Sequence, residues 1–361
     1  MSPEQDIACL FDLGGKALHA EPHGHGLIND TFVVTTDAGH KAILQRINRR
    51  VFPKPELISE NLRTLLNHIQ GRQAQNPPTG RAWKMPVMYR TREGKDFSID
   101  HEGGFWRAMS FIEDTCTFDT ITDLTQAEEV GFALGRFHSL VHDLDPAQLH
   151  ETLPGFHKAP GYFVRFLRAS ARPQRAATNQ DLLYCLQFVE TRWSLTRILE
   201  TARREGKLAV RTIHGDTKLN NFLFDTNSGK AVSLIDLDTV QPGLIQYDIG
   251  DCLRSCANPA GESPADIGTV HFDLDIGHAL LRHYLAETKS FLTQADYDYI
   301  YDAIHLIPFE LGLRFLTDHL EGDCYFKTEW RGQNLHRAMV QFRLTESIER
   351  NERLVKLLIA G

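Results

Sequence analysis

Residues 213–239 read IHGDTKLNNFLFDTNSGKAVSLIDLDT. Two short apolar runs flank a Thr-Asn-Ser-Gly turn, a pattern that predicts a β-hairpin. Polar side chains that could hold a metal ion or a reacting hydroxyl group stand where these runs begin and end: His214, Asp216, Asn221, Asp236 and Asp238. Aspartate and asparagine also favour turns, so any one of these residues taken alone is more simply explained as part of a loop.

The spacing of these residues favours a chemical role for the set as a whole. Lys218 and Asn221 follow Asp216 by two and five residues. Asp236 comes directly after the second apolar run. In phosphoryl transfer from ATP, a loop carboxylate orients the acceptor hydroxyl, a lysine lies near the γ-phosphate, and an amide and a second carboxylate bind Mg²⁺. Hard oxygen ligands of this kind suit Mg²⁺ and not zinc.

Length and composition limit the class of protein. The chain has 361 residues, of which 42% are hydrophobic and 24% charged, as expected for a globular protein large enough to form two lobes. A net charge of −8 argues against nucleic acid as the main partner, although it does not exclude a nucleotide. The six cysteines form no CxxC pair, no signal-peptide pattern is present, and no apolar run approaches the roughly 20 residues that span a bilayer. We therefore expect a cytoplasmic protein that has reduced thiols and no membrane partner.

The pattern along the chain predicts two lobes. Alternating apolar runs and glycine- or proline-containing turns indicate strands in the first third, with one helix near residues 56–69. Later segments are helical by period, and only residues 213–239 interrupt them with strands. We expect an α+β protein with a small β-rich N-terminal lobe, residues 1–112, and a large, mostly helical C-terminal lobe, residues 113–361, hinged near residues 110–114.

The motifs HGDTKLNN, LIDLDTV and YDIGD occur in this order and resemble those of the aminoglycoside phosphotransferase and choline kinase superfamily. Further stretches, among them GLINDTF, IDLDTVQPGL and GLRFLTDHLEGDCYF, resemble the N-acetylhexosamine 1-kinase group within it. The resemblance implies a bilobal protein-kinase-like fold, with ATP as co-substrate and Mg²⁺ as cofactor. It also implies a sugar or amino-sugar acceptor that is phosphorylated at its anomeric hydroxyl group.

The resemblance assigns a role to each residue of the catalytic motifs. Asp216 would be the base that accepts the proton of the acceptor hydroxyl, and Lys218 would lie against the γ-phosphate. Asn221 and Asp236 would hold the Mg²⁺ ion that bridges the ATP phosphates. These four positions match the family pattern without a departure.

Several other polar residues are assigned supporting roles or none. His214 and Asp248 would brace the backbone of the catalytic loop, and Asp238 has no role that the resemblance defines. His138 and His142 are four residues apart, the spacing of paired zinc ligands, but the glutamate of an HExxH motif is missing. We therefore expect these two histidines to serve helix packing.

In the N-terminal lobe the resemblance implies that GHGLINDTF covers the phosphates, with contacts from Asn29 or Thr31. A cation on the third strand, paired with a glutamate of the following helix, would reach the α- and β-phosphates. Arg46 stands in place of the usual lysine, and Glu60 would be its partner. Gln45 lies on the opposite strand face, so an error of one residue in register would exchange the roles of Gln45 and Arg46.

The acceptor would lie against the segment LGLRFLTDHLEGDCYF. The spacing of Glu310, Arg314 and Asp318 by four residues is typical of a solvent-facing ladder of ion pairs. The resemblance instead implies that Arg314 and Tyr325 contact the sugar and that Asp318 orients Arg314. Leu27 stands where these sugar kinases tend to have a histidine, which leaves the exact sugar open.

Two other functions remain open at this point. A kinase of another hydroxyl compound, such as an aminoglycoside, an amino alcohol or a different sugar, would share the catalytic residues. A pseudokinase that binds a nucleotide or a sugar as a regulator would be expected to have lost Asp216, Asn221 or Asp236, and all three are present.

Overall fold

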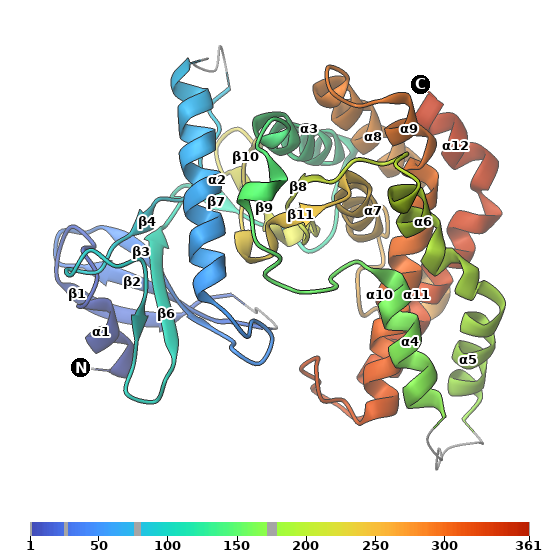
Figure 1. Cartoon of the computed structure of the whole chain (residues 1–361), viewed down its shortest axis with the longest axis horizontal. Helices are drawn as coiled ribbons and strands as arrows, with labels where there is room; N and C mark the ends of the chain where they lie inside the picture. The colour runs from blue at the N-terminus through green and yellow to red at the C-terminus, as the bar shows by residue number, and fades with distance from the viewer. Residues whose placement is uncertain (1, 25–27, 76–80, 172–178, 361) are drawn as a thin grey trace.

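The computed structural model describes residues 2–24, 28–75, 81–171 and 179–360. Its N-terminal part is a six-stranded antiparallel sheet with strand order β1-β2-β3-β6-β4, in which β5 also pairs with β6. The helix α2 lies beside this sheet and faces the rest of the molecule (Figure 1). The elements are α1 (Pro3–Ala8), β1 (Ala17–Pro22), β2 (Asp30–Thr36), β3 (Lys41–Ile47), α2 (Glu56–Gln75), β4 (Met88–Tyr89), β5 (Ser98–Ile99) and β6 (Phe105–Ser110).

The remainder of the chain is mostly helical and contains two small antiparallel sheets, β10-β9-β7 and β11-β8. Its strands are β7 (Thr115–Cys116), β8 (Arg211–Ile213), β9 (Phe222–Asp225), β10 (Ala231–Leu234) and β11 (Gln241–Gly243). Its helices are α3 (Leu124–Val141), α4 (Ala159–Ser170), α5 (Gln180–Arg192), α6 (Ile198–Arg204), α7 (Ile245–Cys256), α8 (Leu274–Thr288), α9 (Gln294–Asp298), α10 (Ile300–Glu321), α11 (Gln333–Arg350) and α12 (Glu352–Ala360).

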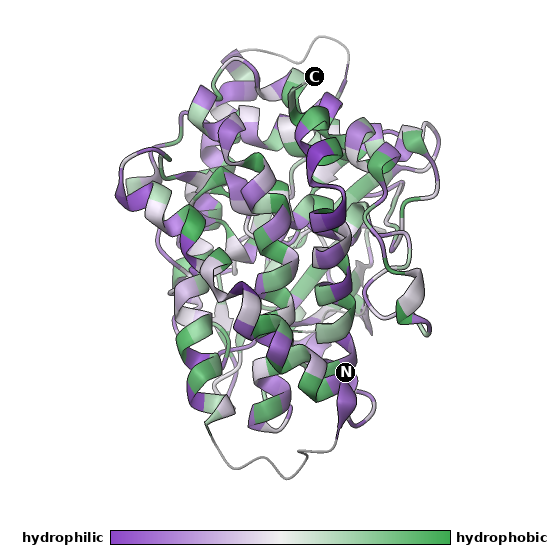
Figure 2. Ribbon diagram, turned by 90° about the vertical axis from the view of Figure 1, so that its right-hand side faces the viewer, coloured by the Kyte–Doolittle hydropathy of each residue, from purple (hydrophilic) through white to green (hydrophobic). Residues whose placement is uncertain are grey.

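Close packing of helix pairs forms the core of this second part. The pair α3 and α8 approaches closely because Gly131 and Gly135 face α8: a Cβ atom at Gly131 would lie 2.1 Å from the carbonyl oxygen of Leu280. Polar and apolar residues alternate along the outer helices, which bury one face each (Figure 2). The largest apolar cluster continues from these helices to α2, so both parts of the chain share one packed core.

The structure confirms the α+β fold class and most of the expected elements. The helix expected near residues 56–69 extends over Glu56–Gln75, and the hairpin expected in residues 213–239 is formed by β9 and β10. After Ser110 the chain no longer pairs with strands of the first sheet. The next strand, β7, pairs with β9 in the second part of the chain. This change of sheet is compatible with the predicted lobe boundary between residues 112 and 113, which remains a prediction.

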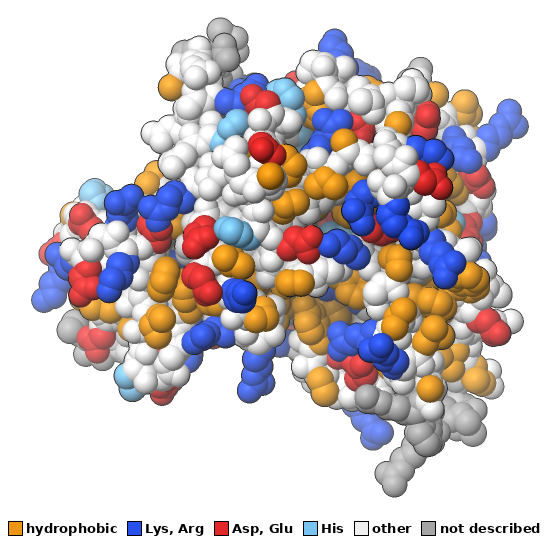
Figure 3. All heavy atoms as spheres, in the orientation of Figure 1, with side chains coloured by type: hydrophobic (Ala, Val, Ile, Leu, Met, Phe, Trp, Pro, Cys, Tyr) orange, Lys and Arg blue, Asp and Glu red, His pale blue; other side chains and the backbone are white. Residues whose placement is uncertain are grey.

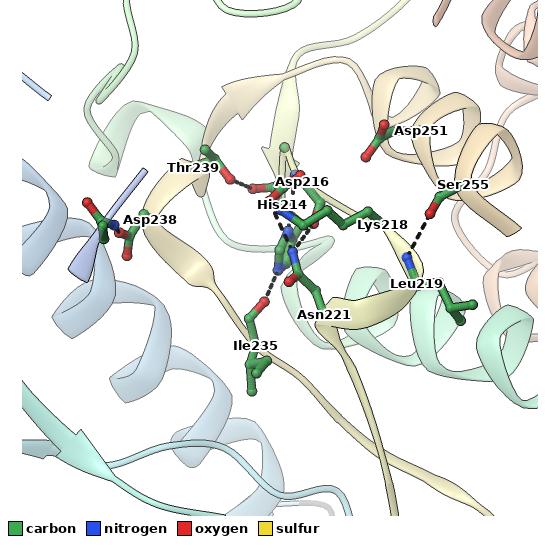
Figure 4. Close-up of polar contacts among 12 residues, drawn as sticks. His214, Asp216, Lys218, Leu219, Asn221, Ile235, Asp238, Thr239, Asp251 and Ser255 are labelled. Atoms are coloured by element: carbon green, nitrogen blue, oxygen red, sulfur yellow. Dashed lines mark hydrogen bonds and ion pairs between the residues drawn. The ribbon is translucent and has the colours of Figure 1, made fainter. Parts of the chain in front are cut away.

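Among the described residues, every helix is too short or too polar to cross a membrane. On the face shown in Figure 3, side chains of both charges are interspersed among apolar ones. The sheet and the helical part meet around the ends of β9 and β10, where the candidate site lies (Figures 1 and 4).

Candidate active site

The loop that follows β8 carries the candidate catalytic residues (Figure 4). It begins with a tight turn at Gly215, whose φ of 85° is a left-handed conformation that favours glycine. A Cβ atom at this position would lie 2.8 Å from the carbonyl oxygen of Thr239. The loop ends in the 3₁₀ turn Leu219–Asn221, directly before β9. The sequence HGD therefore needs its central glycine for both conformation and space.

The carboxylate of Asp248, on α7, fixes the backbone of this loop. It accepts hydrogen bonds from the backbone N–H groups of His214 at 2.7 Å and Gly215 at 2.8 Å. His138 of α3 contacts the same carboxylate at 2.9 Å. Burial would raise the pKa of Asp248, but the contacts with His138 and the nearby His214 hold it below its ordinary value. The expected bracing role of Asp248 is confirmed, whereas His138 does more than pack between helices, because its two ring nitrogens contact Asp248 and the hydroxyl of Tyr284.

His214 is a second brace of the loop. Its Nδ1 accepts a hydrogen bond from the backbone N–H of Asp216 at 3.2 Å, and its Nε2 donates to the carbonyl oxygen of Ile235 at 2.9 Å. This pair of partners requires the neutral imidazole with its proton on Nε2. Burial lowers the pKa of His214, which agrees with that protonation state. His214 thus connects the loop to the segment that carries Asp236.

Asp216, Lys218 and Asn221 converge on one point. Lys218 Nζ lies 2.7 Å from Asp216 Oδ2, and Asn221 Nδ2 donates to the backbone carbonyl of Asp216 at 2.7 Å and to its Oδ2 at 3.1 Å. Burial would raise the pKa of Asp216, but the charge and hydrogen bond of Lys218 lower it below its ordinary value. Asp216 is therefore an ionised, oriented carboxylate, as a base that receives a hydroxyl proton has to be.

Asp236 follows β10 and faces the same point. It adopts the left-handed conformation at φ 63°, which is uncommon for a residue with a side chain. Burial and the charge of Asp238 raise the pKa of Asp236 to about 6, with Lys218 opposing them. Among the described residues, neither its carboxylate nor Asn221 Oδ1 receives a hydrogen bond.

These two free oxygen donors fit a divalent cation. The described residues contain no group of three or more His, Cys, Asp or Glu side chains that could hold a metal by themselves. One carboxylate and one amide oxygen suit Mg²⁺, which usually completes its shell with water and substrate phosphates. Asn221 and Asp236 are thus the protein groups that could hold such an ion.

The expected pair of Arg46 and Glu60 is wrong. Arg46 lies on the sheet face that points away from the loop, where its guanidinium is 5.8 Å from the ring centre of Trp106 and 3.6 Å from Glu102. Glu60 is exposed and pairs with His150 at 2.9 Å. The next residue of α2, Asn61, points toward the second part of the chain. It is buried, and its Nδ2 donates to the carbonyl oxygen of Val240 at 2.8 Å.

Gln45 and Arg107 occupy the sheet face toward the loop, and the sequence interpretation missed Arg107. The two residues are cross-strand partners on β3 and β6. Arg107 is 1% exposed, donates to Gln45 Oε1 at 2.7 Å, and forms an ion pair with Asp238. A charged residue within the apolar run FWRAMS was the signal that could have identified it. The cation of the N-terminal sheet that contacts the catalytic segment therefore comes from β6, not from β3.

Asn29 and Thr31 join the same network. Asn29 Nδ2 donates to Asp238 Oδ2 at 2.6 Å, and Thr31 Oγ1 accepts a hydrogen bond from Gln45 at 3.1 Å. Asp238, which had no assigned role, thus receives donors from two segments of the sheet region. Leu27, at the position where a histidine was expected, lies outside the described residues.

A cavity of about 370 Å³ contains the predicted acceptor residues, and Phe156 in its lining directly precedes His157, which contacts the carbonyl oxygen of Gly215 in the catalytic loop. Arg314 enters the cavity from α10, and its guanidinium lies 5.2–5.5 Å from the ring centres of Phe156, Tyr162 and Phe326. Burial raises the pKa of Tyr162 to about 12, so its hydroxyl keeps its proton. Tyr325 also lines the cavity. The volume is within the range of small-molecule sites, roughly 300–1,000 Å³.

Asp318 lines this cavity but does not act on Arg314 as expected. Its carboxylate accepts four hydrogen bonds of 2.8–3.0 Å, from the backbone N–H groups of Cys324, Tyr325 and Phe326 and from Asn334 Nδ2. Asp318 therefore fixes the loop that presents Tyr325 and Phe326. The solvent-facing ladder of ion pairs is excluded as well, because Glu310 and Asp318 are buried.

Comparisons with known proteins agree with this geometry. The sequence profile of the phosphotransferase enzyme family matches residues 19–284. An aminoglycoside phosphotransferase from Alicyclobacillus acidocaldarius subsp. acidocaldarius DSM 446 is similar in structure, with a TM-score of 0.64 at 16% identity over 99% of this chain and 97% of that one.

Two further solved structures share the fold. An amicoumacin kinase in complex with AMP-PNP and Ca²⁺ has a TM-score of 0.58 at 16% identity, over 97% of this chain and 94% of that one. A microcompartment-associated aminopropanol kinase has a TM-score of 0.55 at 15% identity, over 98% of both chains. At these identities the structural matches establish the fold, and the profile match establishes the family.

Proposed function

The chain belongs to the phosphotransferase enzyme family, and from this premise we propose that it transfers the γ-phosphoryl group of ATP to a sugar hydroxyl group. The acceptor that we propose is an N-acetylhexosamine, phosphorylated at its anomeric hydroxyl. Support for a nucleotide and a divalent cation comes from the two unpaired oxygen donors beside Asp216 and from the related amicoumacin kinase, which was solved with AMP-PNP and Ca²⁺.

Each residue of the loop has a place in this reaction. Asp216 accepts the proton of the acceptor hydroxyl, because its carboxylate is ionised and oriented by Lys218 and Asn221. Lys218 offers its remaining N–H donors to the transferred phosphoryl group. Asn221 and Asp236 would hold Mg²⁺, which would neutralise charge on the phosphate oxygens. Catalysis is then mainly positioning and charge stabilisation.

The charges in the acceptor cavity support our choice of an uncharged sugar as the acceptor. Arg314 has no ion-pair partner among the described residues, and Asp318, the carboxylate in the cavity lining, already accepts hydrogen bonds. Glu310 pairs with His157, and Asp318 accepts its four hydrogen bonds. The cavity therefore offers a positive, donor-rich group next to aromatic rings. Such a surface suits hydroxyl and acetamide oxygens stacked against a ring.

The same charge balance weighs against a cationic acceptor. An aminoglycoside or an amino alcohol would bring an ammonium group toward Arg314 in a cavity whose lining carboxylate, Asp318, already accepts four hydrogen bonds. Like charges at such separations cost affinity unless water or an anion screens them. An aminoglycoside phosphotransferase and an aminopropanol kinase share this fold, so an acceptor panel that includes both classes of compound discriminates between the alternatives.

A panel of acceptors tests this proposal directly. The purified protein is incubated with Mg·ATP and with N-acetylhexosamines, hexosamines, simple hexoses, aminoglycosides and ethanolamine, and the release of ADP is followed. We expect turnover with an N-acetylhexosamine and a phosphate at its anomeric carbon by ³¹P NMR. Preference for an aminoglycoside or an amino alcohol would refute the sugar assignment and leave the phosphotransferase family intact. The Asp216→Asn variant is the control for contaminating kinases.

A further inference from the structure

His157 occupies an unusual position between the acceptor cavity and the catalytic loop. It is buried, and its backbone is left-handed at φ 56°. The ring is 5.2 Å from that of Tyr247, in a stacked arrangement, and 4.1 Å from that of Phe156. Phe156 in turn lines the acceptor cavity. A residue with a side chain is held in this conformation only where its surroundings fix it firmly.

Both ring nitrogens of His157 contact oxygen atoms, one of a carboxyl group and one of a backbone carbonyl. Nδ1 lies 3.0 Å from the Glu310 carboxylate, and Nε2 lies 3.0 Å from the carbonyl oxygen of Gly215. A neutral imidazole has a single N–H, so it would place a lone pair against one of these oxygens. An imidazolium ion donates to both oxygens at once, whereas a neutral imidazole fits only if a protonated Glu310 donates to Nδ1.

The groups that surround His157 agree with a positive charge. Burial by itself would lower its pKa, but the charge and hydrogen bond of Glu310, followed by the charge of Asp251 and the carbonyl of Gly215, raise that pKa above its ordinary value. Glu310 lies on α10, and Asp251 and Tyr247 lie on α7. The cation nearest along α10 is Arg314, one turn beyond Glu310.

The two hydrogen-bond partners of His157 belong to the two parts of the proposed reaction centre, the catalytic loop and the acceptor helix α10. Gly215 directly precedes Asp216, the base, and it is fixed from the other side by Asp248. Glu310 precedes Arg314, the cation of the acceptor cavity, by one helical turn. A rigid group between them sets the distance from the base to the acceptor. Small errors in that distance are costly, because a shift of about 1 Å can reduce the rate by on the order of 10²-fold.

We propose that His157 is a positioning residue which, as an imidazolium ion, ties the catalytic loop to the acceptor helix and so sets Asp216 against the acceptor hydroxyl. The proposal rests on the proposed function for its activity readout, but not for its charge state. The contact is complete while His157 is protonated. Because the pKa is raised, the contact persists above the ordinary imidazole range and is lost as the pH rises through the folded pKa.

The charge state is tested by NMR on the full-length protein labelled with ¹⁵N-histidine. The His157 resonances are identified by their absence in the His157→Gln variant. We expect both ring nitrogens to be protonated at pH 7. In Glu310→Gln the amide can donate to Nδ1, so His157 becomes neutral without losing the bond to Gly215. A wild-type His157 with one bare nitrogen at pH 7 would overturn the proposal.

The positioning role is tested by the pH profile of turnover. We expect kcat of the wild type to fall on the order of 10–10²-fold as the pH rises through the NMR-determined pKa of His157, with little change in KM for ATP. The Glu310→Gln variant should lack this alkaline limb, an outcome that simple loss of stability does not produce. The matched control is His150→Gln, since His150 is an exposed histidine whose ring pairs with Glu60, away from the catalytic loop. The same alkaline limb in Glu310→Gln and wild type would refute the role.

One readout remains if no acceptor is phosphorylated. The backbone amide shifts of Gly215 and Asp216 should move in His157→Gln, and with pH in the wild type, but stay unchanged in His150→Gln. Failure of the acceptor panel together with these shifts would refute the proposed function alone. Unmoved amides would refute the link between His157 and the loop, whatever the substrate.

Discussion

Replacement of Arg107 by methionine removes the cation that joins the sheet to the catalytic segment. The side chains of Arg107 and Asp238 are 1% and 3% exposed, so the carboxylate would remain in a buried place without its charge partner. Removing one member of a buried ion pair costs about 3–5 kcal/mol. Gln45 would also lose its donor, although part of that loss is included in the same figure. We therefore expect Arg107→Met to lower the free energy of unfolding by about 3–5 kcal/mol.

A double variant separates the energy of the ion pair from the energy of side-chain packing. In Arg107→Met/Asp238→Asn the uncompensated charge is gone, while the amide oxygen that replaces the carboxylate can still accept the hydrogen bond from Asn29. The combined loss should be smaller than the sum of the two single losses by about 2 kcal/mol or more. The control is Arg46→Met, because Arg46 lies on the other face of the sheet at 39% exposure and makes one exposed ion pair. Its effect should stay within about 0.5 kcal/mol.

Urea unfolding followed by tryptophan fluorescence gives these free energies, with the slope m as the check that the same transition is compared. The Mg²⁺ concentration for half-maximal turnover should also rise in Arg107→Met, since Asp238 is two residues from Asp236 on the same turn. Additive losses in the double variant, or a loss below about 1 kcal/mol for Arg107→Met, would refute the reasoning. The buried ion pair would then make little net contribution to the free energy of unfolding.

The remaining predictions concern single side chains of the site. Asp216→Asn should lower kcat by on the order of 10²–10⁴-fold with little change in KM for ATP, and near-normal turnover would remove the base assignment. Asp236→Ala should raise the Mg²⁺ requirement and lower turnover together; an unchanged Mg²⁺ titration would exclude it as a ligand. Glu60→Ala should leave KM for ATP within about twofold, because Glu60 pairs with His150 in solvent, and a tenfold rise would restore its expected role. Asp318→Ala should cost roughly 2–4 kcal/mol of stability, because it leaves backbone N–H donors unpaired, and it should raise KM for the acceptor. A normal KM for the acceptor would show that the loop fixed by Asp318 does not contribute to acceptor binding.

Local spacing made the catalytic loop predictable from the sequence. Asp216, Lys218 and Asn221 lie within six residues, and the hairpin that follows them is itself a local structure that ends at Asp236. Their relative positions are therefore determined by a short stretch of backbone. Burial of the bracing Asp248 could be expected only through the family resemblance.

Contacts between distant segments could not be predicted in the same way. Arg107 and Gln45 meet because β3 pairs with β6 across 62 residues of sequence. His157 finds its partners 58 and 153 residues away. The strand β3 packs on both faces, so its alternation gave no indication that Gln45, and not Arg46, faces the loop. Only the register of the folded sheet decides this.

The number of hydrogen-bond donors around each aspartate separates the roles that the sequence could not. A carboxylate has about four lone-pair sites, and those already occupied cannot bind a ligand. Asp318 accepts four hydrogen bonds, and Asp248 has three partners, so both are structural anchors. Asp238 has two partners, both from the sheet region, and acts as a connector. Asp236 receives none among the described residues, and burial raises its pKa, so a divalent cation is the partner that would stabilise its charge.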